Sequence, residues 1–298
     1  MKILLFGKNG QVGWELQRSL APLGEVVALD FDSSDLCGDF SKPDKLAQTI
    51  RAVAPDVIVN ASAHTAVDKA ESEPDLARTI NALAPGVLAR EAKSINALLV
   101  HYSTDYVFDG QGEKPWVETD ATAPLSVYGA TKLEGEKLIQ QSGCKYLIFR
   151  TSWVYAARGG NFAKTMLRLA AERESLTVIN DQVGAPTGAD LLADITAHSV
   201  RSTLHAPELC GLYHLVAGGE TSWHGYANFV IDFARRSGKP IKVAADAIKA
   251  VPTSEFRTAA TRPLNSRLAT GKLRQTFGFN IPHWQDGVTR MLTEILEK

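Results

Sequence analysis

Residues Gly7-Lys8-Asn9-Gly10-Gln11-Val12-Gly13 lie between a short apolar run, Ile3–Phe6, and an amphipathic stretch, Gln11–Leu20. The glycines repeat as G-x-x-G-x-x-G, and glycine lets a backbone turn tightly and approach a pyrophosphate closely. A helix that begins at such a turn presents free N–H groups and a partial positive charge, which favour anions. A turn of this kind can serve structure alone. Its place after a first strand nevertheless predicts a dinucleotide site at Gly7, Gly10 and Gly13.

Short apolar runs alternate with longer amphipathic stretches through the first half of the chain. The predicted strands are Ile3–Phe6, Val26–Leu29, Val57–Val59, Leu98–Tyr102 and Leu147–Phe149. The predicted helices are Gln11–Leu20, Lys45–Val53, Pro74 to about Lys93, and Thr131–Gln141. Strands that are apolar along their whole length and alternate with helices indicate a buried parallel sheet. Right-handed crossovers then predict an α/β fold with a Rossmann-type doubly wound sheet.

The alternation loosens after about residue 150. We expect helices near Asn161–Glu172, Gly188–Thr203, Trp223–Arg236 and Trp284–Leu296, with short strands at Thr177–Ile179 and Leu212–Leu215. The pattern predicts a dinucleotide-binding domain over residues 1–150. A smaller, mixed α/β substrate-binding domain over residues 151–298 would pack at the carboxyl edge of the sheet. Late segments could return to the main sheet.

The bulk composition excludes several classes of function. The chain of 298 residues has 32 basic and 33 acidic side chains, so no general attraction to nucleic acid or to an anionic membrane is expected. Its three cysteines are far apart and form no C-x-x-C pair, which disfavours a disulfide framework and favours a reducing cytoplasm. Residues 1–7 are too short in apolar length for a secretory signal, and no run reaches a membrane span. We expect a soluble, intracellular protein.

Asp30 ends the second predicted strand, 20 residues after Gly10. An acid at this place accepts hydrogen bonds from the adenine ribose hydroxyls and repels the 2′-phosphate of NADP. Phe31 and Asp32 follow it, and no arginine does. Asp30 therefore predicts that NADH is used at least as well as NADPH. The alternative is a solvated loop aspartate.

Tyr128-Gly129-Ala130-Thr131-Lys132 forms a Y-x-x-x-K pattern at the start of a predicted helix, which places both side chains on one face. A neighbouring ammonium stabilises a phenolate, so Tyr128 could protonate a carbonyl oxygen while Lys132 also holds the nicotinamide ribose. The fourth strand runs into Ser103-Thr104, at the end of the sheet where doubly wound folds place their chemistry. We expect Thr104 to complete a Thr-Tyr-Lys set, with Ser103 as the alternative.

These motifs resemble those of the extended short-chain dehydrogenase/reductase family, and within it the reductases of nucleotide-linked keto sugars. The resemblance rests first on Gly7–Gly13, Asn60–Asp68, Ser103–Phe108 and Tyr128–Lys132. It continues through Arg150–Tyr155, Asn180–Gln182, Gly184–Thr187, Arg262-Pro263 and Asn265-Ser266. The second domain would then be mainly a sugar-nucleotide-binding one.

The resemblance implies reduction of the C4 keto group of dTDP-4-dehydro-L-rhamnose to dTDP-L-rhamnose by NADH or NADPH. This is the last step in making a rhamnosyl donor for bacterial surface polysaccharide, such as lipopolysaccharide O-antigen. Related dehydratases carry Asp-Glu after the threonine, whereas Asp105 here is followed by Tyr106. Elimination is therefore not expected, and no base for a 5-epimerase can be assigned. A reductase of another nucleotide 4-keto-6-deoxysugar, or a non-catalytic dinucleotide-binding regulatory subunit, stays open.

The resemblance also assigns roles to single residues. Gln11 and Val12 would lie along the pyrophosphate, and Asp39 and Phe40 would meet the adenine. Residues flanking the cofactor further along would be Ala61, Ala63, His64, Thr65 and Tyr102. We expect His64 to line the cofactor cleft rather than bind a metal, because no second histidine sits at ligand spacing.

Substrate contacts are expected from Thr104, Asp105, Trp153 and Arg262. Trp153 could cover a sugar face or pack in the core. Arg262 could bind the diphosphate or form a domain-spanning ion pair. Trp116, Trp223 and Trp284 are assigned to packing.

The family resemblance further implies a homodimer with a shared Mg²⁺ site. The matching positions are Glu15, Asp190 and Glu294, which the sequence alone would make surface carboxylates. Asp190 is shorter than the glutamate expected at its position.

Overall fold

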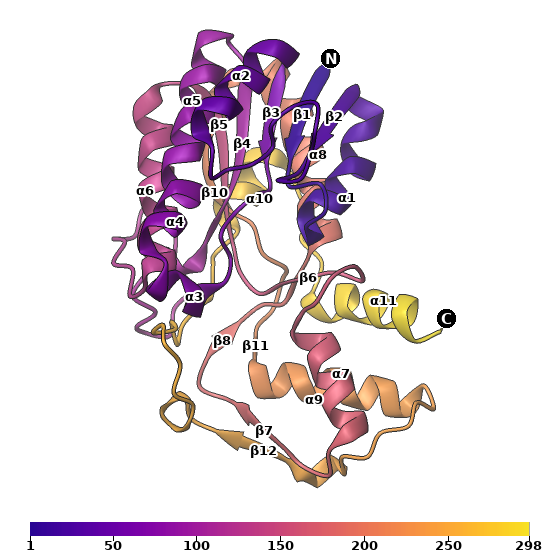
Figure 1. Ribbon diagram of the computed structural model, residues 1–298. Coiled ribbons are helices and arrows are strands. Elements are labelled where there is room, and N and C mark those ends of the chain that lie inside the picture. Colours follow the sequence, from indigo (N-terminus) through magenta and orange to yellow (C-terminus); the bar gives the residue numbers. More distant parts are fainter. Residues whose placement is uncertain (298) are drawn as a thin grey trace.

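The main body of the molecule is a six-stranded parallel sheet with helices on both faces (Figure 1). The computed structural model describes residues 1–297. The strands are β1 (Lys2–Phe6), β2 (Glu25–Leu29), β3 (Val57–Asn60), β4 (Leu98–Thr104), β5 (Lys145–Thr151) and β10 (Gly211–His214), in the order β10-β5-β4-β3-β1-β2. Every neighbouring pair is parallel. The predicted doubly wound α/β sheet is confirmed.

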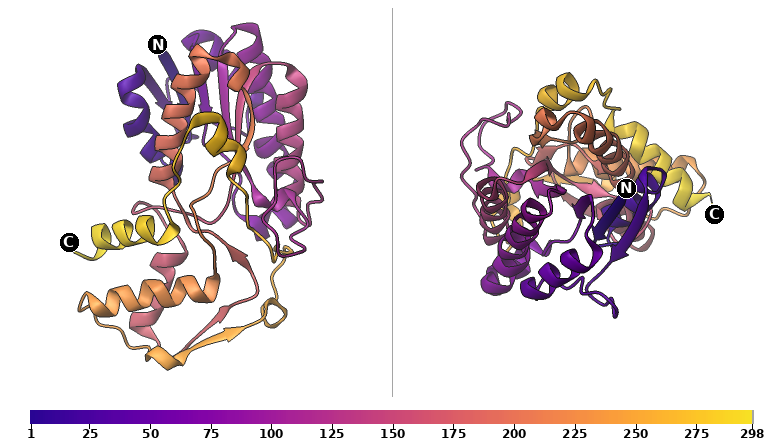
Figure 2. Two further views of the ribbon diagram at one scale, coloured as in Figure 1. Left: turned by 180° about the vertical axis from the view of Figure 1, so that it is seen from behind. Right: turned by 90° about the horizontal axis from the view of Figure 1, so that it is seen from above.

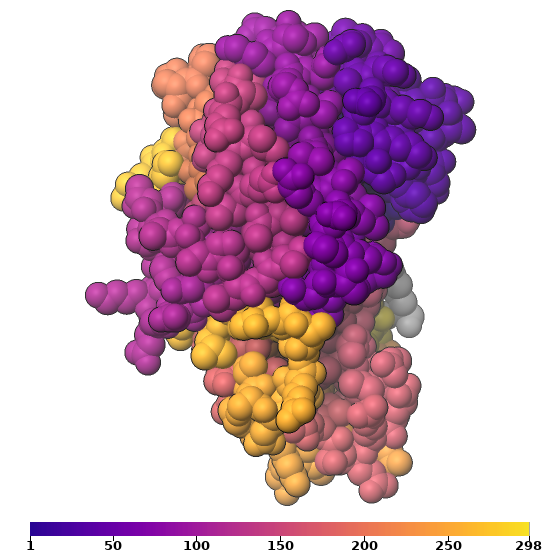
Figure 3. Space-filling view, turned by 60° about the vertical axis from the view of Figure 1, so that its left-hand side comes forward, coloured from indigo at the N-terminus to yellow at the C-terminus, as the bar shows by residue number. Residues whose placement is uncertain are grey.

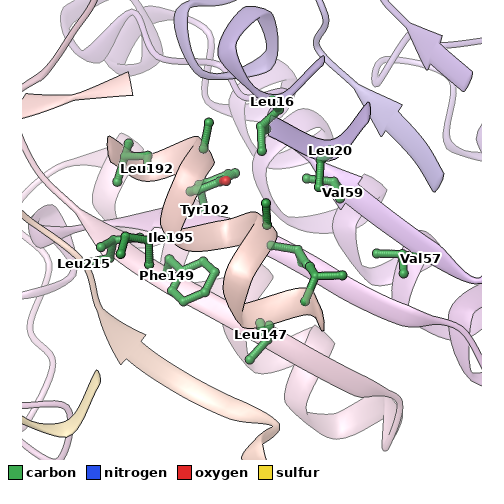
Figure 4. Packing of buried hydrophobic residues seen from close by; sticks show 14 of the residues in the cluster. Leu16, Leu20, Val57, Val59, Tyr102, Leu147, Phe149, Leu192, Ile195 and Leu215 are labelled. Atoms are coloured by element: carbon green, nitrogen blue, oxygen red, sulfur yellow. The ribbon is translucent and has the colours of Figure 1, made fainter. Parts of the chain in front are cut away.

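Two apolar layers hold this sheet between helices. One face packs against α1 (Gln11–Leu20), α8 (Ala189–His205) and α10 (Gly271–Phe277), which contribute Leu16, Leu192 and Leu273 to a fully buried cluster. Figure 4 shows this layer, and Figure 2 shows α8 and α10 covering the sheet from behind. The other face packs against α2 (Pro43–Val53), α5 (Ala84–Ser94) and α6 (Val127–Ser142). A sheet covered on both sides has apolar strands throughout, as the sequence pattern indicated.

The predicted long helix from Pro74 to about Lys93 is interrupted in the structure. It consists of α4 (Pro74–Arg78), a π-helical turn at Thr79–Leu83, and α5. A short helix, α3 (Val67–Ser72), precedes it. Helix α6 begins four residues earlier than predicted, because Ser126 caps it by accepting a hydrogen bond from the Gly129 N–H. This early start places Tyr128 in the first turn of the helix.

A second, narrower body lies below the sheet (Figures 1 and 3). It contains α7 (Phe162–Glu172), α9 (Trp223–Arg236), α11 (Trp284–Leu296), and the parallel pair β7 (Leu176–Ile179) and β12 (Ile248–Val251). Its core is a separate cluster that includes Met166, Tyr226 and Trp284. Two short strand pairs join the bodies, namely β6 (Val154–Tyr155) with β9 (Thr187–Gly188), and β8 (Val183–Gly184) with β11 (Thr221–Ser222).

Segments from the second half of the chain also complete the main sheet. Strand β10 pairs with β5, and α8 packs along α1. The sheet therefore crosses the boundary expected at residue 150. No helix within residues 1–297 is long and apolar enough to cross a membrane.

Candidate active site

A cleft of about 610 Å³ opens at the carboxyl ends of β1, β3, β4 and β5. It runs from the glycine turn, past Asp30 and Phe40, to Tyr128 and finally to Trp153. The predicted residues that line it are Gly7, Gly10, Gln11, Val12, Asp30, Asp39, Phe40, Ala61, Ala63, Thr65, Tyr102, Thr104, Asp105, Tyr128, Lys132 and Trp153. The predicted residues absent from its wall are Gly13, His64, Arg262, Glu15, Asp190 and Glu294.

The glycine turn has the shape that a pyrophosphate requires. Gly7 has a φ of +86°, and a Cβ there would lie 2.8 Å from the Ala61 backbone. A Cβ on Gly13 would lie 1.9 Å from the Gly7 carbonyl oxygen, so Gly13 acts by letting α1 pack against the turn. Helix α1 has no side-chain cap and no acid in its first turn, which leaves its N–H groups directed at the cleft. This cradle fits a dinucleotide.

The Asp30 carboxylate is held in place at the rim of the cleft. Its Oδ2 accepts a hydrogen bond from the Asn9 N–H at 2.9 Å, and its Oδ1 accepts one from the Phe31 N–H at 2.8 Å. These bonds orient the carboxylate beside the glycine turn, where a ribose hydroxyl would reach it.

Tyr128 and Thr104 meet at the centre of the cleft. The Tyr128 ring lies edge-on to Tyr106, with centroids 5.4 Å apart. Burial raises the pKa of Tyr128 to about 12, against a hydrogen bond with the Thr104 hydroxyl that lowers it. Ser103, the alternative to Thr104, has a buried hydroxyl without a partner in residues 1–297. Tyr128 thus holds its proton next to Thr104.

Lys132 lies one turn after Tyr128 and is almost fully buried, with 2% exposure. Its Nζ donates to the Tyr102 carbonyl oxygen at 2.5 Å and lies 3.2 Å from His101 Nε2. Burial lowers the pKa of Lys132 to about 8, although the nearby Glu136 raises it. The ammonium is therefore poised to titrate just above neutral pH.

Asp105 places a buried carboxyl group at the same end of β4. The Thr104 hydroxyl donates to its Oδ1 at 3.0 Å. Burial raises the pKa of Asp105 to about 6, while hydrogen bonds from Ser266 and Thr104 lower it. A carboxylate in this state is suited to accept a hydrogen bond from a sugar hydroxyl.

Two stacked indoles close the far end of the cleft. Trp153 and Trp223 have ring centroids 3.6 Å apart and an angle of 14° between their planes. Trp153 has a φ of +49°, and a Cβ on Gly184 would lie 3.0 Å from its ring. The Trp223 Nε1–H donates to Gln182 Oε1. Assigning Trp223 to packing alone was wrong, because it also lines the cleft. Only its position as the first helical residue after the Ser222 cap marks it in sequence.

Trp116 and Trp284, the other two tryptophans assigned to packing, pack as expected. Trp116 stacks on Phe108 with centroids 4.6 Å apart, and Trp284 is buried in the core of the lower body.

Arg262 makes the domain-spanning ion pair rather than lining the cleft. Its Nη2 lies 2.7 Å from Asp68 Oδ2, and its Nη1 lies 3.2 Å from Asp68 Oδ1. This fork links α3 to the 260s segment. The position of Arg262 supports the second of its two expected roles, and a diphosphate contact stays a prediction.

His64 is half-buried and does not line the cleft, and its side chain is 8% exposed. Its backbone N–H donates to Asn81 Oδ1, and its Nε2 lies 3.6 Å from Glu73 Oε2. Among residues 1–297, no three His, Cys, Asp or Glu side chains are placed to hold a metal.

The three residues matched to a magnesium site do not form one within a single chain. Asp190 pairs with Arg290 at 3.0 Å, and Glu15 pairs with Arg18 at 3.4 Å. Arginines beside these carboxylates already supply the balancing positive charge. A site shared between two subunits stays a prediction, and no chemical step is assigned to Mg²⁺.

The similarity to known proteins extends over the whole chain. Residues 1–297 match the family model described as RmlD substrate binding domain. A dTDP-4-dehydrorhamnose reductase from Shigella flexneri is 62% identical over 99% of this chain and 98% of its own. One from Escherichia coli K12 is 61% identical over the same shares.

Solved structures agree with the curated relatives. A dTDP-4-dehydrorhamnose reductase from Clostridium acetobutylicum superposes with a TM-score of 0.89 at 36% identity, covering 100% of both chains. One from Bacillus anthracis, in complex with NADP, has a TM-score of 0.87 at 34% identity and covers 98% of this chain and 99% of its own.

Proposed function

The chain belongs to the RmlD substrate binding domain family, and from this membership we propose that it reduces the C4 keto group of dTDP-4-dehydro-L-rhamnose to dTDP-L-rhamnose. It is an NAD(P)H-dependent oxidoreductase. The observation that carries the proposal is the meeting of Thr104, Tyr128 and Lys132 in a cleft continuous with the glycine turn. Relatives that share more than half of their residues with this chain bear the name of this reaction.

The main sheet supplies the cofactor site and the proton. The glycine turn and the α1 N–H groups bind the pyrophosphate, and Asp30 accepts from the adenine ribose. When bound, the reduced nicotinamide supplies hydride to C4 of the sugar. Tyr128 donates its phenolic proton to the C4 oxygen, which Thr104 orients through its hydroxyl. The Lys132 ammonium stabilises the phenolate that remains.

The lower body completes the site around the sugar nucleotide. We propose that residues 1–150 mainly hold the dinucleotide and that residues 151–298 mainly hold the sugar nucleotide. Asp105 accepts from a sugar hydroxyl, and the stacked Trp153 and Trp223 cover an apolar sugar face. These groups orient C4 and exclude water from the reacting atoms.

The test measures NADH absorbance while the protein meets freshly prepared dTDP-4-dehydro-L-rhamnose. We expect rapid oxidation, with kcat lowered by about 10²-fold or more in Tyr128→Phe because its proton donor is gone. Tyr213→Phe on β10, which removes a hydroxyl that donates to the Leu209 carbonyl oxygen, is the matched control and should turn over normally. Near-normal kcat in Tyr128→Phe contradicts the mechanism.

The remaining alternatives give different outcomes in the same assay. Oxidation only with another nucleotide 4-keto-6-deoxysugar identifies a different substrate. NADH binding without oxidation of any sugar identifies a regulatory subunit. A kcat/KM for NADPH far above that for NADH would contradict the role given to Asp30.

We also propose a homodimer in a reducing, cytoplasmic setting. Trp14 on the outer side of α1 is 46% exposed, and aromatic groups are enriched at subunit interfaces. Cys37, Cys144 and Cys210 are free thiols. The solution mass should be that of a dimer, and dissociation on adding a chelator would support the shared magnesium site at Glu15, Asp190 and Glu294. A mass that the chelator leaves unchanged would count against that site.

A further inference from the structure

Lys132 is backed by a buried pair of side chains to which the proposed reaction gives no role. His101 on β4 and Asn60 on β3 are paired across the two strands, and each is 1% exposed. Asn60 Nδ2 lies 3.0 Å from His101 Nδ1, and His101 Nε2 lies 3.2 Å from Lys132 Nζ. The three residues thus form one continuous line of polar contacts that leads from β3 to the catalytic lysine.

The orientation of Asn60 determines which nitrogen of His101 carries the proton. Asn60 Oδ1 accepts a hydrogen bond from the Ser62 N–H at 2.9 Å, so the amide NH₂ group must face His101. If the Asn60 amide were reversed, its NH₂ group would face the Ser62 N–H, and two hydrogen-bond donors would oppose each other. His101 Nδ1 is therefore the acceptor, and a neutral ring holds its proton on Nε2. Burial and the charge of Lys132 keep the pKa of His101 well below its usual value, so the ring stays neutral.

This arrangement directs an N–H group of His101 at Lys132. An ammonium can only donate hydrogen bonds, whereas a neutral amine can accept one from Nε2–H. If the ring instead held its proton on Nδ1, that N–H would face the Asn60 NH₂ group, and two hydrogen-bond donors would oppose each other there. The contact with His101 therefore favours the neutral amine.

Other charged groups around Lys132 offset this effect only in part. Glu136 favours the ammonium, but its carboxylate is engaged by Arg150 in a two-pronged buried pair at 2.7 and 2.9 Å. Tyr128 and Asp105 line the same cleft as Lys132, and the Tyr102 carbonyl oxygen accepts a hydrogen bond from the Lys132 Nζ.

We propose that Asn60 and His101 are positioning residues that weaken the hold of Lys132 on its third proton and so set the upper pH limit of the reduction. The link to reduction rests on the proposed function, since Lys132 assists Tyr128 only while it is an ammonium. Above the pH at which Lys132 becomes neutral, the phenolate loses its stabilising charge and kcat/KM falls.

Two substitutions should each replace the N–H donor that faces Lys132 with an acceptor, in different ways. Asn60→Asp keeps the acceptor for Ser62 N–H and offers a second oxygen to His101 Nδ1–H, so Nε2 becomes an acceptor for the ammonium. His101→Gln places an amide oxygen near Lys132 without adding charge. Both should shift the alkaline limb of kcat/KM upward by about one pH unit. His214→Gln alters another buried histidine, whose ring faces Arg150, and should leave the limb unchanged.

The decisive measurement needs no turnover. The ¹³Cε shift of Lys132, assigned by its loss in Lys132→Arg, is followed against pH, and the histidine ¹⁵N spectrum identifies the tautomer of His101. We expect Nε2–H in the wild type, Nδ1–H in Asn60→Asp, and a higher Lys132 midpoint in both variants. A wild-type Nδ1–H ring, or unmoved midpoints in folded variants, would overturn the inference. This titration needs no substrate. Its result therefore tests the roles of Asn60 and His101 separately from whether the chain catalyses the proposed reduction.

Discussion

At the scale of single residues, the buried carboxyl group of Asp105 serves the site but lowers the free energy of unfolding once it ionises. Burial raises its pKa to about 6 from 3.8, so its ionisation opposes folding. The stability that it contributes is complete below about pH 4 and is lost as the pH rises through 6. Asp105→Asn should therefore raise the free energy of unfolding at pH 8 relative to pH 5, on the order of 1 kcal/mol, while kcat/KM falls. Urea unfolding at the two pH values checks this, and a difference independent of pH would contradict it.

Trp223 gives a second test at this scale. Trp223→Leu removes the stack with Trp153, worth about 0.5 to 1.5 kcal/mol, and should raise KM for the sugar nucleotide by roughly 2- to 10-fold. Binding of NADH should be unaffected, because the indoles lie beyond Tyr128 from the glycine turn. Trp116→Phe, in the stack with Phe108, is the matched control. Weaker NADH binding in Trp223→Leu would show that the pair serves the cofactor.

At the scale of elements, the long periodic helices could be predicted closely, and the short connections could not. Gln11–Leu20, Trp223–Arg236 and Trp284–Leu296 have the bounds expected from their apolar spacing. The π-helical turn at Thr79–Leu83 was missed because a single extra residue per turn hardly alters that spacing. Two-residue strands such as β8 and β11 have no period to detect. They exist only because distant segments pack together.

The junction of α6 with the turn after β4 carries a prediction of its own. A Cβ on Gly129 would lie 2.2 Å from the Tyr106 carbonyl oxygen, so Gly129→Ala should push the first turn of α6 away from β4. Displacing Tyr128 in this way should lower kcat by at least about 10-fold, because misplacement of 1 Å can cost about 10²-fold. Gly271→Ala, with open space around its Cβ, is the control. Equal kcat values in the two variants would show that the junction tolerates the shift.

At the scale of the whole molecule, the sequence pattern indicated two halves, but packing ties them together. The site residues on motifs, such as Thr104, Tyr128 and Lys132, could be found from local spacing. His101 and Trp223 could not, because their roles arise from side chains that come from other parts of the chain. The same holds for the main core, where Leu192, Ile195 and Leu215 from the second half pack on the sheet of the first (Figure 4).

This shared core makes residues 1–150 an incomplete folding unit. Without α8 and β10, the fragment would expose the sheet face that Leu192, Ile195 and Val200 cover, and the edge of β5. We expect the isolated fragment to lack a cooperative thermal transition and not to bind NADH, as circular dichroism and fluorescence would show. Co-expression with residues 151–298 is the control and should restore both, since it returns the missing strand and helix. A fragment that unfolds cooperatively and binds NADH alone would mean that α1 and the glycine turn are held by the first five strands, without α8.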